Sequence, residues 1–101
     1  MQRLRLPYLA GTRDLVHELL ATQDVPASLA GEVLVALCRD MAAASESFAD
    51  ELVREVVVVR GADGLALVGA PSKFVEHCRT AAIRRRVRRR VQRRRAVEVG
   101  V

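Results

Sequence analysis

The chain has 101 residues, half of them hydrophobic, and carries a formal net charge of +5. This length suits one domain with a single core, and the hydrophobic content excludes a chain that is disordered by composition. The absence of any run of about 18 uncharged apolar residues excludes a membrane span, and the N-terminal region lacks the apolar stretch of a signal peptide. We therefore expect a cytoplasmic protein.

The charge is distributed unevenly along the chain. Residues 1–79 hold eight basic and eleven acidic side chains, whereas residues 80–101 hold nine arginines and one glutamate. The pattern predicts a mildly acidic domain over residues 1–83. Residues 84–101 are then either an Arg-rich C-terminal extension or the end of the last helix.

The first half of the chain predicts a strand, a helix and a second strand. Residues 2–6 alternate polar and apolar before Pro7, which indicates a short strand. Thr12 can cap a helix with apolar residues at helical spacing, which ends near residues 23–24. Residues 33–38 form a continuous apolar run, which favours a strand buried on both faces over a segment of buried helix.

The next segment predicts a second helix. Ser47 and Asp50 have the spacing of a capping box, and Gly61 can end the helix. Its expected apolar face consists of Phe48, Leu52, Val56 and Val59.

The remaining residues predict a strand, a helix and one further element. Residues 65–68 form a short apolar run, and Ser72 can cap a last helix. The apolar face of that helix consists of Phe74, Val75, Cys78, Ala81 and Ala82. Residues 96–101 are a last strand or a loose end. Alternating strands and helices predict an α/β fold, with a small, mostly parallel sheet and three crossover helices.

The sequence contains no motif for catalysis, for a cofactor or for a metal ion. Residues 61–64 lack the Lys and Ser/Thr of a phosphate-binding loop. His17 and His77 have no partner at metal-ligand spacing, and adjacent His77 and Cys78 point in different directions on a helix. Cys38 and Cys78 form no CxxC motif and are expected to be buried in a reducing compartment. We therefore expect a non-enzymatic protein without cofactor or metal.

One acidic pair, Asp50-Glu51, lies inside the second predicted helix. Paired carboxylates can serve acid–base catalysis when their environments differ. Within a helix the more common arrangement is a solvated acidic face, and that is our interpretation here.

Four segments together carry a resemblance to a known family: residues 33–39, 44–52, 65–68 and the helix that begins at Ser72. The most specific of them is Ser-Glu-Ser-Phe-Ala-Asp-Glu-Leu, residues 45–52. An apolar strand, a short turn with serines and a helix that opens on this segment resemble the STAS fold, in particular the STAS-like regulatory family. The resemblance covers most of residues 3–91. The family pattern Asp-Ser-Ser-Gly is replaced here by Ala-Ser-Glu-Ser at residues 44–47.

Proteins similar to this family are bacterial anti-sigma-factor antagonists. They bind a kinase-type anti-sigma factor, and phosphorylation of a serine at this helix N-terminus releases them. The resemblance implies a protein-interaction module for partner switching, with Ser45 at the phospho-acceptor position and Ser47 as a second candidate. The expected partner-binding surface consists of Arg39, Asp40, Ser45, Glu46, Ser47, Asp50 and Glu51.

Two other interpretations of the serines stay open. Both can serve only as helix caps, which contribute about 0.5–2 kcal/mol. A constitutive binder without phosphorylation is equally compatible with the segment. A phosphate at a helix N-terminus would be tolerated by the fold, because unpaired N–H groups and the helix dipole favour an anion there.

The Arg-rich segment supports a second class of function, a small nucleic-acid-associated protein. The candidate residues are Arg84, Arg85, Arg86, Arg88, Arg89, Arg90, Arg93, Arg94 and Arg95. Such a density of arginines binds phosphates in a salt-dependent way. If the segment is helical, Ile83, Val87 and Val91 form a narrow apolar stripe, which suits nucleic acid, an anionic membrane surface or an acidic partner. A solvated helix end is the remaining interpretation.

Overall fold

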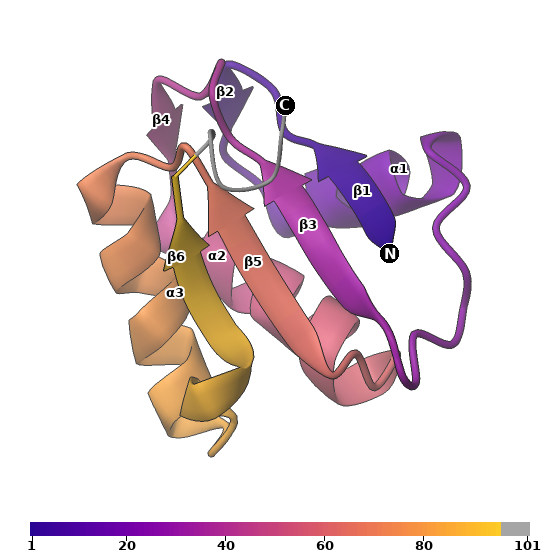
Figure 1. Ribbon diagram of the computed structural model, residues 1–101. Helices are drawn as coiled ribbons and strands as arrows, with labels where there is room; N and C mark the ends of the chain where they lie inside the picture. Colours follow the sequence, from indigo (N-terminus) through magenta and orange to yellow (C-terminus); the bar gives the residue numbers. More distant parts are fainter. Residues whose placement is uncertain (96–101) are drawn as a thin grey trace.

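Four parallel strands form the central sheet, in the spatial order β1, β3, β5, β6 (Figure 1). The computed structural model describes residues 1–95. The four strands are β1 (Gln2–Arg5), β3 (Val33–Leu37), β5 (Gly64–Val68) and β6 (Val91–Arg94). A separate parallel pair consists of β2 (Leu9–Ala10) and β4 (Ala43–Ala44).

All three α-helices lie on the same face of the sheet (Figure 1). They are α1 (Arg13–Thr22), α2 (Glu46–Val53) and α3 (Ser72–Arg84). A π-helical segment, η1 (Arg54–Val59), continues α2, and a short 3₁₀ helix, η2 (Arg88–Arg90), precedes β6. Crossovers between parallel strands are right-handed, so a strand order that never reverses places every helix on one side. The predicted α/β fold with a mostly parallel sheet and three crossover helices is confirmed.

The main core fills the space between the sheet and the helices. Its largest fully buried side chains include Phe48 of α2 and Phe74 of α3, whose ring centroids are 6.1 Å apart. The predicted apolar face of α3 is buried as expected. Thr12 caps α1 as predicted, because its hydroxyl accepts a hydrogen bond from the backbone N–H of Leu15.

The other face of the sheet, here called the open face, has no helix packed on it within residues 1–95 (Figure 1). Parallel sheets are usually covered by helices on both faces. A second, small apolar cluster lies there, formed by Val35, Ala66 and Val68 with Leu37 beside them. Alternation along the strands also places Arg3 and Arg5 of β1 and Gln92 and Arg94 of β6 on this face.

The N-cap of α2 is Ser45, and the prediction that Ser47 caps this helix is wrong. The Ser45 hydroxyl accepts a hydrogen bond from the Phe48 N–H at 3.0 Å, whereas Ser47 lies inside the helix and is exposed. Asp50 does not complete a capping box, since its carboxylate accepts hydrogen bonds from Arg13 and Arg85 instead.

The apolar face predicted for the second helix changes in its second half, where α2 continues into the wider π-helical segment η1. Phe48, Leu52 and Val56 are buried as predicted, but Val59 is 55% exposed. The π-helical turn of η1 alters the angular step between residues, so that Val57 is buried instead. Gly61 ends the segment as predicted, with a positive φ of 71°.

The Arg-rich segment is part of the fold. Helix α3 ends at Arg84, and β6 then adds a fourth strand whose single buried residue is Val91. Ser72 is not the N-cap of α3: Pro71 occupies that position, and Ser72 is the first helical residue. The strand predicted as an alternative for residues 96–101 lies outside the described residues. Within residues 1–95, no helix is long and apolar enough to cross a membrane.

Candidate functional site

The start of α2, defined as Ser45, Glu46 and Ser47, is positioned by the small β2–β4 pair. Ala10 pairs with Ala44, and the Ser45 N–H donates to the Ala10 carbonyl at 2.9 Å. The Ser45 hydroxyl donates to the Gly11 carbonyl at 2.9 Å while accepting from the Phe48 N–H. One hydroxyl therefore links the turn before α1 to the first turn of α2.

The two candidate serines differ in their surroundings. Ser45 is half-buried and its hydroxyl acts as both donor and acceptor. Ser47 is exposed, and its side chain forms no hydrogen bond within residues 1–95. Glu46 is exposed on the side of α2 that faces α3, where it lines a pocket of about 150 Å³ with His77 and Arg84. A substitution at Ser45 therefore disturbs the contact between the turn before α1 and the start of α2, whereas a substitution at Ser47 changes only the exposed surface.

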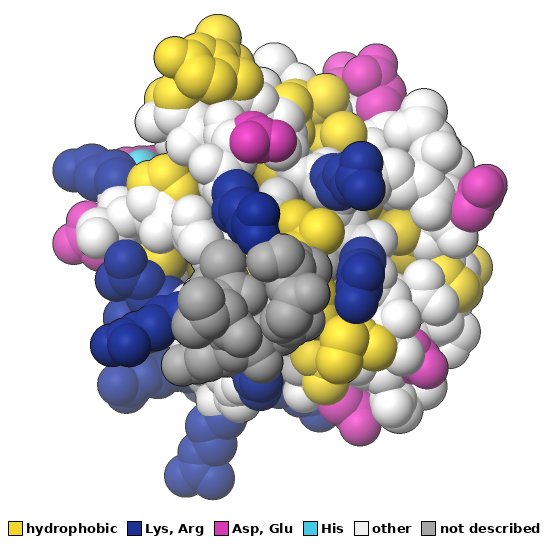
Figure 2. All heavy atoms as spheres, turned by 45° about the horizontal axis from the view of Figure 1, so that its top comes forward, with side chains coloured by type: hydrophobic (Ala, Val, Ile, Leu, Met, Phe, Trp, Pro, Cys, Tyr) yellow, Lys and Arg dark blue, Asp and Glu magenta, His cyan; other side chains and the backbone are white. Residues whose placement is uncertain are grey.

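Exposed apolar side chains lie close to the start of α2 in the fold. Tyr8 and Leu9 are 66% and 63% exposed. The Tyr8 carbonyl accepts hydrogen bonds from the N–H groups of Ala42 and Ala43, and Leu9 pairs with Ala43 in the β2–β4 pair. Figure 2 brings this end of the molecule forward, with hydrophobic side chains among its surface atoms. The same small sheet thus presents apolar side chains and leads into Ser45.

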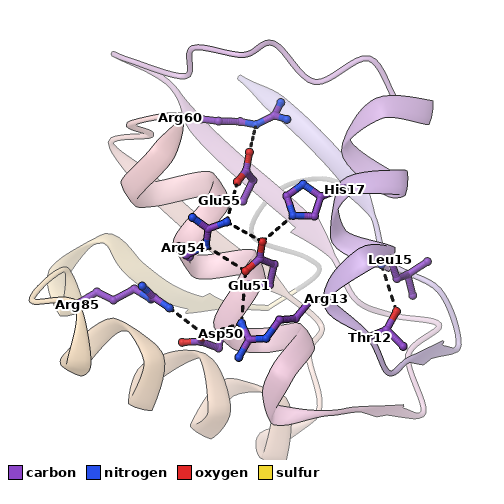
Figure 3. Close-up of polar contacts among 10 residues, drawn as sticks. All are labelled: Thr12, Arg13, Leu15, His17, Asp50, Glu51, Arg54, Glu55, Arg60 and Arg85. Atoms are coloured by element: carbon purple, nitrogen blue, oxygen red, sulfur yellow. Dashed lines mark hydrogen bonds and ion pairs between the residues drawn. The ribbon is translucent and has the colours of Figure 1, made fainter.

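A network of charged side chains joins α1, α2, η1 and α3 (Figure 3). Its centre is Glu51, whose side chain is only 6% exposed. The Glu51 carboxylate accepts hydrogen bonds from Arg54 at 3.0 and 3.1 Å and from Arg13 at 3.4 Å, and lies 2.6 Å from His17 Nε2. Hydrogen bonds from Arg54, then from His17, outweigh burial and lower the pKa of Glu51 to about 2.

Asp50 and Glu55 extend this ion-pair network. Asp50 accepts hydrogen bonds from Arg13 and Arg85, both at 2.8 Å. Burial alone would raise the pKa of Asp50, but these two bonds hold it below its usual value. Glu55, also buried, pairs with Arg60 at 3.3 Å.

The prediction that Asp50-Glu51 forms a solvated acidic face is therefore wrong. Glu51 is buried and its carboxylate is fully engaged, so it does not form part of an accessible binding surface. The sequence concealed this arrangement, because Arg13 and His17 lie more than 30 positions away on another helix. The available signal was the four-residue spacing of Arg13 and His17, which places both side chains on one face of α1.

His17, Glu51 and Glu55 also bring ligand-type atoms within 4.8 Å of one another. Imidazole and carboxylate groups at such distances can hold a divalent cation. Here Arg13, Arg54 and Arg60 already bind the carboxylate oxygens. Their positive charge occupies the place that a cation would need, so the group is organised as salt bridges.

Arg39 and Asp40, predicted to border the partner surface, line a different pocket. They follow β3, are exposed, and face a pocket of about 570 Å³ together with Arg3, Arg5 and Leu37. The candidate surface of seven residues is therefore divided among the start of α2, the ion-pair network and the open face.

The two cysteines are buried, as predicted. Burial raises the pKa of the Cys38 thiol to about 12, and burial also raises the pKa of Cys78. A thiol with a raised pKa is a poor nucleophile at neutral pH. Both side chains therefore serve as small members of the core.

The nine candidate arginines of the C-terminal segment fall into two groups. In the first group, Arg85 pairs with Asp50, Arg93 donates to the Ser72 hydroxyl, and Arg94 donates to the side-chain oxygen of Gln92 at 2.7 Å. Arg95 belongs to this group as well. The second group, here called the Arg-rich end, consists of Arg84, Arg86, Arg88, Arg89 and Arg90 at the end of α3 and in η2. All five are exposed, and within residues 1–95 none forms an ion pair, although Arg90 donates to the Ala62 carbonyl.

The Arg-rich end also has an apolar part. Ile83 is 56% exposed and lines a pocket of about 530 Å³ with Val87 and four of these arginines. Helix α3 runs from the end of the molecule that carries β2 and β4 to the opposite end (Figure 1). The arginines of η2 therefore lie at the end of α3 that is far from β2 and β4, whereas Arg84 lines the same pocket as Glu46 at the start of α2.

No family model, curated protein or solved structure matches the chain. Its function is therefore inferred from the chemistry of its own residues.

Proposed function

We propose that the chain is a regulatory protein-interaction module of the STAS-like type, without enzymatic activity, that acts in the cytoplasm. It binds a kinase-type anti-sigma factor or a similar regulator through the start of α2 and the neighbouring apolar side chains. The observation that carries the proposal is the position of Ser45, whose hydroxyl caps α2 and also binds the Gly11 carbonyl.

The composition of this surface supports protein binding. Interface centres combine aromatic and apolar side chains with a polar rim. Tyr8 and Leu9 supply exposed apolar area, and Glu46 and Ser47 supply exposed polar groups nearby in the fold. Asp50 contributes indirectly, because its bonds to Arg13 and Arg85 hold α2 against α1 and α3.

The proposal includes a serine switch, with different consequences at the two serines. A phosphate adds about −1.5 to −2 charges at neutral pH. At Ser45 it would remove the hydrogen bond to the Gly11 carbonyl and place negative charge beside that oxygen. At Ser47 it would add charge to the exposed surface and leave the cap intact. Either modification weakens binding, the first by moving the β2–β4 pair and the second by direct repulsion or steric exclusion.

Affinity capture of the tagged full chain from its own cells, after nuclease treatment, tests the proposal. Mass spectrometry identifies the bound proteins and any phosphate on Ser45 or Ser47. We expect an ATPase-type kinase with the unmodified chain, and its loss with Ser47→Glu. Ser28→Glu is the matched control, because Ser28 is an exposed serine in the connection between α1 and β3. Failure to recover such a kinase, or equal recovery with both variants, would refute the proposal.

A second candidate function is favoured by the Arg-rich end, which presents exposed arginines without ion pairs in the described part of the chain. Guanidinium groups of this kind release counterions when they bind nucleic-acid phosphates. Truncation after Arg84 would remove β6 and uncover the core beside Leu65 and Leu67, so substitutions are the cleaner test.

A gel shift with double-stranded and single-stranded probes at two salt concentrations measures this second function. Arg88→Gln/Arg89→Gln should weaken binding and flatten its salt dependence by about one unit of slope per lost phosphate contact. Arg3→Gln/Arg5→Gln removes the same charge elsewhere and serves as the control. Binding that is unchanged by the first variant, or equally weakened by both, would exclude a nucleic-acid site at the Arg-rich end.

A further inference from the structure

The pocket on the open face lies at the carboxyl ends of β1 and β3. It encloses about 570 Å³ and is lined by Arg3, Arg5, Leu6, Gln23, Leu37, Arg39 and Asp40. Small-molecule sites in proteins typically enclose about 300–1,000 Å³ and combine apolar walls with a few polar groups. The size of this pocket meets that description. Its lining is more polar, because two leucines stand beside four charged side chains and one amide, and such a lining favours a charged ligand.

The lining of the pocket carries more positive than negative charge. Arg3, Arg5 and Arg39 supply three guanidinium groups, and Asp40 is the single acid in the lining. Within residues 1–95 none of these three arginines forms an ion pair. In the ion-pair network, by contrast, Arg13, Arg54 and Arg60 are all bound to carboxylates. Figure 2 shows basic side chains on this face with hydrophobic atoms between them.

The walls of the pocket are held in place by the fold. The Gln23 side-chain amide bonds to both backbone groups of Arg5, at 2.8 and 2.9 Å, and so closes the free edge of β1 with the end of α1. The Leu6 N–H donates to the Leu37 carbonyl at 3.0 Å, which extends the sheet under the pocket. The Arg39 stem passes close to Gly69, where an added Cβ would lie 3.1 Å from Arg39 Cγ.

We propose that this pocket binds a small organic anion. Its oxyanion, a phosphate or a carboxylate, is held by the guanidinium groups of Arg3, Arg5 and Arg39, which match such groups in bidentate geometry. Its apolar or planar body lies against Leu37 and Leu6. This inference is independent of the proposed protein partner, since none of these residues belongs to the start of α2.

Titration of the ¹⁵N-labelled full chain tests the proposal by NMR, with phenyl phosphate, benzoate and inorganic phosphate as probes. We expect saturable shifts at the amides of residues 3–6 and 37–40, and tighter binding of at least one organic anion than of inorganic phosphate. The tighter of phenyl phosphate and benzoate identifies the preferred oxyanion. Shifts that do not saturate, shifts centred on the Arg-rich end, or equal affinity for inorganic phosphate would overturn the proposal.

Two matched double variants test whether the probe binds in this pocket or responds only to the positive charge of the protein. Arg3→Gln/Arg5→Gln should weaken binding of the preferred probe by about tenfold or more, as expected for the loss of charge-assisted hydrogen bonds. Arg88→Gln/Arg89→Gln removes the same charge from the Arg-rich end and should leave the affinity unchanged. Equal weakening by the two variants would show that the probe responds only to net charge, which contradicts the proposal. Arg39→Gln supplies a second, independent variant of the pocket, with weaker binding expected.

Discussion

The α2 region, residues 45–60, and the Arg-rich end use charged residues in opposite ways. In the α2 region the charged side chains with little exposure are paired, and Glu51 alone contacts two arginines and a histidine. At the Arg-rich end, five exposed arginines form no ion pair in the described part of the chain. In the α2 region the paired charges hold the helices together, so that only the start of α2 remains accessible to a partner. At the Arg-rich end the unpaired charges remain available to a ligand.

Removal of Glu51 should have the largest effect on stability. Glu51→Ala leaves Arg13 and Arg54 without their shared partner and creates a gap between α1 and α2. We expect a loss of about 2–3 kcal/mol, the scale of hydrogen bonds to a buried charged group. Urea denaturation measures the change. Glu46→Ala, at an exposed position of the same helix, is the control and should have a much smaller effect. Similar losses of stability in the two variants would contradict the claim that the paired carboxylate of Glu51 stabilises the fold and the accessible one of Glu46 does not.

Acid should destabilise the protein through the same carboxylate. The pKa of Glu51 is lowered from 4.5 to about 2 in the folded chain, so between these pH values the unfolded chain binds more protons. Stability is therefore highest above pH 4.5 and falls as the pH decreases toward 2. The lowered pKa of Asp50 acts in the same direction.

Glu51→Gln should make the urea midpoint less sensitive to pH across this range, since the substituted side chain does not titrate. An equally steep acid dependence in this variant would assign the effect to other carboxylates.

Substitution of either serine should reduce the stability of the protein by less than the removal of Glu51 does. Ser45→Ala removes the N-cap and the bond to Gly11, with an expected cost of about 1 kcal/mol. Ser47→Ala changes an exposed side chain and should stay within about 0.5 kcal/mol of the parent. Thermal and urea unfolding of both variants give the comparison. A greater loss from Ser47→Ala would contradict the assignment of Ser45 as the cap.

The smallest effect on stability is expected at the Arg-rich end. Arg88→Gln/Arg89→Gln should leave the urea midpoint unchanged, because neither side chain has a partner in the described part of the chain. The same variant should reduce only salt-dependent ligand binding. A clear loss of stability would mean that these arginines support the fold, as those of the ion-pair network do.

The sequence predicted the order of elements because hydrophobic periodicity and caps are local signals. The structure confirms the strand predicted over residues 65–68 and the predicted apolar face of α3. It also confirms Thr12 as the N-cap of α1. Strand β6 was not recognised, because arginines surround its single buried residue, Val91. The prediction of Val59 as buried failed because the π-helical turn shifts the stripe, and no local signal fixed that turn.

The candidate site was predictable only in part. The segment from Ser45 identified the helix start, but the choice between two serines depends on where the helix begins. The partners of Glu51 and the grouping of Arg39 with Arg3 are set by packing between distant segments. Such contacts leave little trace in a single sequence, since spacing reveals only which residues share one face of one element.

One capture experiment tests most directly whether the chain binds its regulator through the start of α2. It compares three forms of the tagged full chain after nuclease treatment: the parent, Ser47→Glu, and Arg88→Gln/Arg89→Gln. We predict that the parent and the arginine variant recover the same ATPase-type kinase, and that Ser47→Glu loses it. Recovery by Ser47→Glu together with loss in the arginine variant would contradict this assignment and place the interaction at the Arg-rich end.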